Sequence, residues 1–162
     1  MKRVLIRIYT AISFFVALSL AGCTDPNAVI DQNTVIINNN WAYVNKIKYA
    51  VKIDDASILY NIYFNLRVTA DYKYSNLFVL LHQTNPDKKS STIRYEFKLA
   101  NADGEWLGDG SGNIYSYQLP FHANYKFPAK GVYFFEIEQN MRDNPLHEIS
   151  DIGLRVEKVK TP

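Results

Sequence analysis

The chain has 162 residues, of which 18 are Lys or Arg and 16 are Asp or Glu, so its formal net charge is +2. Three of the basic residues, Lys2, Arg3 and Arg7, precede position 8, and the others are scattered among acidic and aromatic neighbours. Because a nucleic-acid partner requires a basic face clustered on one element, we exclude that class of partner. The single cysteine also excludes a disulfide within the chain.

The first residues, 1–22, have the pattern of a bacterial lipoprotein signal peptide. A basic start is followed by an apolar run from Ile8 to Leu20, which is shorter than a membrane-spanning helix. Ala21 and Gly22 are small enough for a narrow peptidase site, and they stand directly before Cys23. We therefore expect cleavage before Cys23 and lipidation of its thiol. Such acyl chains would anchor the mature protein to a membrane of the cell envelope, with its folded part facing the periplasm.

The next segment, 23–40, is predicted to be the lipidated N-terminus and a tether. It is polar and lacks a clear period, apart from a short apolar run at 35–37 that predicts a first strand. We expect residues 24–33 to form a flexible stalk. The folded domain is accordingly predicted to span 41–162.

Beyond Trp41, apolar residues recur at every second position, which is the period of a half-buried strand. The alternation is clearest over 47–53, 60–68, 77–81, 93–99, 133–137 and 152–156, with turn residues between the runs. A single helical turn is expected at most, around 140–146. We predict an all-β fold in which two antiparallel sheets pack as a sandwich of the jelly-roll or immunoglobulin-like kind, with a closed barrel as the alternative.

Residues that could form a metal site are dispersed. His82, His122 and His147 lie far apart, and neither a His-Glu-x-x-His pattern nor a cysteine cluster accompanies them. We predict no metal site and no cofactor. A glycine-rich segment, 103–113, contains Gly108 and Gly110 but lacks the Gly-Lys-Ser/Thr pattern of a phosphate-binding loop. We expect this segment to form turns that place Trp106 in the core.

Two groups of charged residues raise the question of catalysis or anion binding. Glu136 and Glu138 share one face of a strand, as a pair of hydrolytic carboxylates would, but the opposite face is apolar, which is typical of solvent-side residues. The arginines Arg67, Arg142 and Arg155 stand in or beside apolar strands. We expect them to form structural ion pairs rather than an anion site, with partners among Asp71, Asp143 and Asp151.

Three segments taken together, 67–77, 103–115 and 127–142, resemble the gliding-motility lipoprotein GldH family of the Bacteroidetes. The ending at 151–157 and the leading lipoprotein signal are also similar to that family, so the resemblance covers nearly the whole chain. Ten positions match its motifs without an assigned role: Arg67, Tyr72, Tyr74, Asn76, Trp106, Gly108, Gly110, Gln139, Met141 and Arg142.

The resemblance implies an envelope lipoprotein that takes part in gliding and is linked to type IX protein secretion. It implies no enzyme, because the family supplies no catalytic residues to carry over. The expected partners are the membrane, through the lipid anchor, and envelope proteins of the gliding or secretion machinery. The alternative is a carbohydrate-binding lipoprotein, in which Trp41, Trp106, Tyr115 and Tyr117 would stack on sugars if their rings were exposed.

Overall fold

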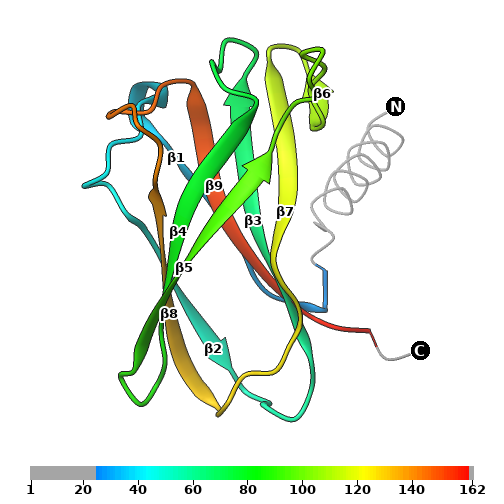
Figure 1. The fold of residues 1–162 in the computed structure, drawn as a ribbon. Helices are drawn as coiled ribbons and strands as arrows, with labels where there is room; N and C mark the ends of the chain where they lie inside the picture. Colours follow the sequence, from blue (N-terminus) through cyan, green and yellow to red (C-terminus); the bar gives the residue numbers. More distant parts are fainter. Residues whose placement is uncertain (1–24, 161–162) are drawn as a thin grey trace, which may run out of the picture.

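The fold of residues 25–160, which the computed structural model describes, consists almost entirely of strands (Figure 1). A short 3-10 helix, η1 (Ile37–Asn39), is the one exception among the described elements. The strands are β1 (Ala28–Val35), β2 (Ile47–Ile53), β3 (Tyr60–Thr69), β4 (Asn76–Thr84), β5 (Ser90–Lys98), β6 (Asp109–Ser111), β7 (Ile114–Tyr125), β8 (Gly131–Gln139) and β9 (Ile149–Lys158). The all-β prediction is confirmed, whereas the helical turn expected over 140–146 is replaced by a loop.

The strands form two antiparallel sheets packed face to face. One has the order β1-β9-β3-β7-β6 and the other the order β2-β8-β4-β5. Most connections cross from one sheet to the other, so strands that follow each other in the chain rarely pair. This is the jelly-roll arrangement, which decides between the two sandwich types that the sequence allowed. Because the sheets are separate, the closed-barrel alternative is wrong.

The core lies between the sheets and comes from the expected alternation of apolar residues. On β3, Tyr60, Ile62 and Phe64 are each at most 1% exposed, and the residues between them face outward. On β8, Tyr133, Phe135 and Ile137 face them from the other sheet. Burying such side chains contributes about 1.5–3 kcal/mol each relative to leaving them in water, so this apolar layer is what holds the two sheets together.

The segment expected to be a tether is largely part of the fold, which corrects the prediction for 23–40. Strand β1 begins at Ala28 and pairs with β9 over its whole length. The pairing depends on a close approach at Gly153, where a Cβ atom would lie 1.8 Å from the Asn33 side-chain oxygen and 2.6 Å from the Gln32 carbonyl oxygen. The sandwich therefore starts at Ala28 rather than Trp41. The boundary at 22/23 lies outside the described residues.

The sandwich has two ends, which we call upper and lower as they are drawn in Figure 1. The upper end consists of the connections 36–46, 70–75, 99–113 and 140–148. The lower end consists of the connections 54–59, 85–89 and 126–130. Within residues 25–160, no helix is long and apolar enough to cross a membrane.

Candidate functional site

The ten motif positions, although spread over 76 residues from Arg67 to Arg142, gather at or next to the upper end. They come from the end of β3 and the connection that follows it, the start of β4, the loop before β6 and β6 itself, and the end of β8 with the loop that follows it. Since the jelly-roll topology brings these connections to one end, the motif describes a continuous region of the molecule. We take this region as the candidate site.

Aromatic rings fill the part of the upper end next to β3. Tyr72 is 4% exposed and contacts Tyr74 and Trp106, at ring-centroid distances of 5.8 and 6.4 Å. The Tyr72 hydroxyl donates a hydrogen bond of 3.0 Å to the carbonyl oxygen of Asn76. Burial raises the pKa of Tyr72, so its ring remains neutral and serves as packing. Trp106 is half-buried against the core, at the edge of the sandwich rather than within it.

The two motif glycines allow their loop to lie directly on β7. A Cβ atom at Gly108 would meet the Tyr117 ring at 2.6 Å, and one at Gly110 would lie 3.3 Å from the Tyr115 ring. Tyr117 in turn donates a hydrogen bond of 2.8 Å to the carbonyl oxygen of Leu99. The predicted turns are present at Gly104 and Gly112, which have positive φ angles. Gly108 is therefore needed for the close approach to Tyr117, and a side chain at Gly110 would press on the Tyr115 ring.

Gln139 organises the loop that follows β8. Its side chain is fully buried, and its amide nitrogen donates a hydrogen bond of 3.0 Å to the carbonyl oxygen of Asp143. Its amide oxygen accepts a hydrogen bond of 2.8 Å from the backbone N–H of Met141. The Met141 sulfur then accepts one of 3.2 Å from the backbone N–H of Phe78 on β4. These bonds fix Met141 and Arg142 relative to the four-stranded sheet.

A groove of about 640 Å³ lies beside this loop. Its lining consists of Tyr74, Phe78, Arg94, Asn140, Met141, Arg142 and Asp143. The guanidinium carbon of Arg94 stacks 3.9 Å from the Phe78 ring centroid, and its Nε donates a hydrogen bond of 2.7 Å to the Asn140 side chain. Arg142 is exposed at the rim. The groove thus combines aromatic and thioether surface with two guanidinium groups.

Among the other residues that line the groove, the Tyr74 hydroxyl donates a hydrogen bond of 2.5 Å to Asp143. This bond, with a smaller contribution from Lys73, lowers the pKa of Asp143. The carboxylate is therefore ionised and already partnered. It has the environment of a structural acceptor and lacks the raised pKa of a general acid.

The structure places the three arginines differently from one another. Arg67 Nε lies 2.6 Å from Asp151 Oδ2, which confirms one of the expected structural pairs. Arg155 instead pairs with Asp25, Asp31 and Glu157, none of which was among the expected partners. Arg142 has no ion-pair partner within residues 25–160, so its charge is free to meet another molecule.

The carboxylates considered for hydrolysis do not converge in a cleft. Glu138 accepts from Lys46 Nζ at 2.8 Å and from His82 Nε2 at 3.0 Å, and Glu136 pairs with Lys48 at 3.1 Å. Partial burial opposes ionisation of Glu138, but its hydrogen bonds outweigh this effect and lower its pKa. Both glutamates are solvent-side partners of lysines on the outer face of the four-stranded sheet.

Sugar stacking by the four aromatic rings is limited by their burial. Trp41 is fully buried and Tyr117 is 8% exposed. Trp106 and Tyr115 contact each other at 5.3 Å, but both are half-buried and their planes are tilted by 32°. The four rings therefore provide no flat, exposed pair on which a sugar could stack.

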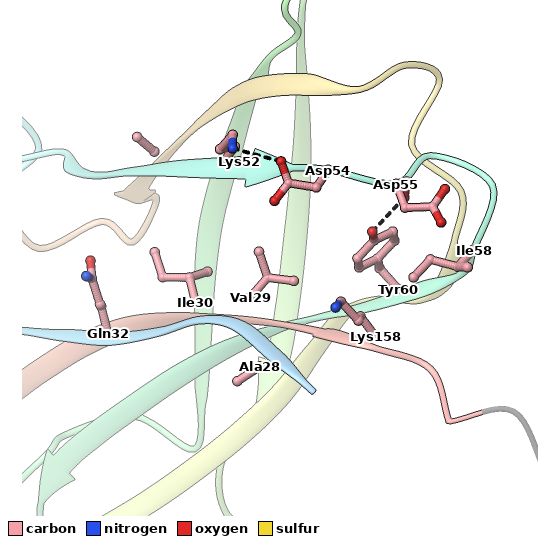
Figure 2. A pocket seen from close by; sticks show the side chains of 11 residues that line it. Ala28, Val29, Ile30, Gln32, Lys52, Asp54, Asp55, Ile58, Tyr60 and Lys158 are labelled. Carbon is pink, nitrogen blue, oxygen red and sulfur yellow. Dashed lines mark hydrogen bonds and ion pairs between the residues drawn. The ribbon is translucent and has the colours of Figure 1, made fainter. Parts of the chain in front are cut away.

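A second cavity, of about 520 Å³, lies at the lower end between β1 and β2 and contains none of the motif residues (Figure 2). Val29, Ile30 and Ile58 form its apolar part. Several of its polar groups are already paired, since Lys52 Nζ lies 2.9 Å from Asp54 and the Tyr60 hydroxyl donates to the Asp55 carbonyl oxygen at 2.6 Å. Within residues 25–160, no cluster of His, Cys, Asp and Glu side chains could hold a metal ion.

Comparison with known proteins places the chain among bacterial lipoproteins. It is 29% identical to the gliding motility lipoprotein GldH homolog of Christiangramia forsetii over 157 residues, covering 93% of this chain and 96% of the relative. It is 27% identical to the gliding motility lipoprotein GldH of Flavobacterium johnsoniae over 156 residues, covering 92% and 96%. A solved chain of infectious bursal disease virus covers 88% of this chain and 47% of its own length, but its 11% identity and TM-score of 0.20 carry no argument.

The model of the GldH lipoprotein family matches residues 28–156, which include all ten motif positions and all nine strands except the last two residues of β9. The match confirms the resemblance that the sequence motifs indicated. This chain belongs to the GldH lipoprotein family.

Proposed function

We propose that this protein is a noncatalytic, lipid-anchored component of the envelope machinery for gliding motility and type IX secretion, and that it acts by binding other proteins. Its membership of a lipoprotein family supports the lipid anchor. The anchor itself is proposed at Cys23, which lies outside the described residues, with the sandwich facing the periplasm. The two relatives are both named gliding motility lipoproteins, which supports the cellular role.

The observation that carries this proposal is the gathering of the motif residues at the upper end. Their internal contacts hold one loop, 140–148, in place beside a groove, and the carboxylate that lines the groove, Asp143, has a lowered pKa rather than the raised pKa of a catalytic acid. Arg, Tyr and Met are the residue types that protein interfaces favour, and the groove combines all three. Its chemistry therefore suits a protein partner better than a reaction.

Exposed apolar side chains at the same end support a protein partner independently. Val35, Ile37 and Val44 are 73%, 81% and 85% exposed, and Leu107 is 51% exposed. They lie at or beside the connections of the upper end. Because large apolar side chains in such numbers at one end are costly to leave in water, they favour a surface that a partner covers.

Affinity capture from detergent-solubilised envelopes of the native host tests the proposal. We expect the full-length lipoprotein to recover identified motility or secretion proteins, and a deletion strain to lose spreading motility or secretion. Arg142→Glu, which reverses the free charge at the groove, should lose most of the recovered partner and most of the motility. Lys130→Glu makes the same change at an exposed lower-end position and should leave both unchanged.

Recovery of the lipoprotein alone, or equal partner recovery by both variants, would contradict the proposal. Circular dichroism and equal envelope levels establish that each variant is folded and exported before its binding is compared.

A further inference from the structure

The chain enters the sandwich through a fixed contact rather than a loose segment. Asp25, the first described residue, forms an ion pair with Arg155 of β9. The backbone N–H of Asn27 donates to the Asp25 carboxylate at 3.0 Å, and that of Lys158 donates to the Asn27 carbonyl oxygen at 2.9 Å. The bonds from Asn27 and Arg155 lower the pKa of Asp25, so the carboxylate stays charged in mildly acidic solution.

Arg155 is the centre of this contact. Its side chain is 13% exposed and also reaches Asp31 of β1 and Glu157 of β9, both at 2.6 Å. Three carboxylates from the entering turn and two strands thus share one guanidinium group. We call these four residues, Asp25, Asp31, Arg155 and Glu157, the Arg155 cluster.

The Arg155 cluster lies on the outer face of the five-stranded sheet. Arg155 is opposite Asp31 on one side and Tyr63 of β3 on the other, and the residues next to it on β9, Leu154 and Val156, point into the core. Cys23 precedes Asp25 by two residues, which can span at most about 7 Å. We therefore expect an acyl chain on Cys23 to start close to Asp25, beside this face.

We propose that the Arg155 cluster fixes the orientation of the protein on its membrane, with the outer face of the five-stranded sheet held against the lipid headgroups. The proposal rests on the lipid anchor at Cys23 proposed above. In place of a stalk that would let the sandwich rotate freely, a turn bonded to β9 joins the anchor to the sheet.

The surface chemistry of the two sheets agrees with this orientation. Around the centre of the five-stranded sheet the outer face is polar: Asn65 donates to Asp31 at 3.1 Å, and Gln118 donates to Asn65 at 3.3 Å. Such a surface is compatible with a hydrated headgroup layer. The outer face of the four-stranded sheet carries the Lys46–Glu138 and Lys48–Glu136 pairs and also exposes Phe134 and Val132, at 52% and 41%. In the proposed orientation these two apolar side chains point away from the lipid and toward proteins.

Depth-dependent fluorescence quenching can test the orientation. The lipoprotein is produced in a host that processes lipoproteins, purified in detergent and placed in phosphatidylethanolamine and phosphatidylglycerol vesicles with nitroxide-headgroup lipid. Because an acylated Cys23 has no free thiol, one introduced cysteine takes the fluorophore. Gln118→Cys puts it on the outer face of the five-stranded sheet, and Ala50→Cys on that of the four-stranded sheet. Two sheets packed about 10 Å apart separate these outer-face probes by roughly 20 Å.

We expect several-fold stronger quenching of the probe at 118 than of the probe at 50. Asp25→Ala removes the side-chain bonds that tie the start of the entering turn to Arg155 and Asn27 but leaves the pairs of Arg155 with Asp31 and Glu157. The protein should therefore still fold, and the two probes should become nearly equal. Arg155→Met should have the same effect.

Equal quenching in the unaltered background, stronger quenching at 50, or an unchanged ratio in Asp25→Ala would overturn the proposal while the lipid anchor stood. Labelling of Cys23 together with loss of the protein from the vesicles would overturn the anchor itself, and the orientation with it.

Discussion

Replacing Gln139 by leucine should destabilise the protein because the side chain supports a loop from inside the core. Gln139 is fully buried, and leucine cannot replace its bonds to the Met141 N–H and the Asp143 carbonyl oxygen. Each buried polar group left without a partner costs about 1–3 kcal/mol. Gln139→Leu leaves two such groups, the Met141 N–H and the Asp143 carbonyl oxygen, without their partner. Since Met141 and Asp143 are half-buried and water can reach them partly, we expect the variant to lose about 2–3 kcal/mol of unfolding free energy, near the lower end of the range for two groups.

Urea unfolding of the mature domain measures this loss of unfolding free energy. Thermal unfolding measures it a second time, because a loss of that size should lower the melting temperature by roughly 4–12 °C for a domain of this length. Gln118→Leu is the matched control, since Gln118 is exposed and makes one side-chain bond of 3.3 Å. Its effect should stay within about 0.5 kcal/mol.

Gln139→Glu keeps the size and shape of the side chain but replaces its amide by a carboxyl group, so it separates the loss of hydrogen bonds from a change in packing. A buried carboxyl group has a raised pKa in the folded state. The loss of stability caused by Gln139→Glu should therefore grow as the pH rises above about 4.3, the pKa of a glutamate in the unfolded chain. The cost of Gln139→Leu should not depend on pH in the same range. Equal unfolding midpoints for Gln139→Leu and Gln118→Leu, with equal slopes, would refute the view that Gln139 supports the loop.

Two further predictions concern β1 and the groove. Gly153→Ala should weaken the β1–β9 pairing by about 1–3 kcal/mol, because the new methyl group would collide with Asn33. Amide hydrogen exchange in β1 should then become faster. An unchanged exchange pattern would show that the close approach at Gly153 is not needed for the pairing. Tyr74→Phe should raise the pKa of Asp143 toward its ordinary value, as seen by carbon NMR of the carboxyl group. In the unaltered protein the bond to Tyr74 stabilises the folded state at pH values above the pKa that Asp143 has in the unfolded chain. This stabilisation is lost as the pH falls through the lower pKa that Asp143 has in the folded protein. After Tyr74→Phe this pH dependence of the stability should be smaller.

The strands that the sequence predicted are those with one buried and one exposed face. In β3 and β8 every second residue is apolar, and the structure buries those residues. Strand β1 lacks this pattern, and its polar sequence predicts a tether instead. It lies at a sheet edge and its second half, from Asp31 to Val35, is exposed, so few of its side chains need to be apolar. Strand β7 was not delimited, since its pairing with β3 shifts register near Ile62 and its pattern contains Pro120.

The candidate site could be predicted only as a set of positions. The family resemblance supplied the ten residues, but no local pattern indicated that Tyr74 would meet Asp143 or that Arg94 would lie beside Arg142. Arg94 belongs to none of the matched segments and was missed. Its exposed position on an edge strand gave no signal until its stacking on Phe78 was visible.

The sequence by itself determined the all-β class and the residues that form the core, because the alternation of apolar and polar side chains is a local property of each strand. It also determined the family, through motifs that keep their order along the chain. The tertiary structure decided which strands pair, that β1 belongs to the sheet, and that Arg155 rather than Arg142 holds the ion-pair cluster. All three outcomes depend on contacts between residues that are distant in the chain, and those of β1 and Arg155 join residues more than 100 positions apart, which local periodicity does not specify.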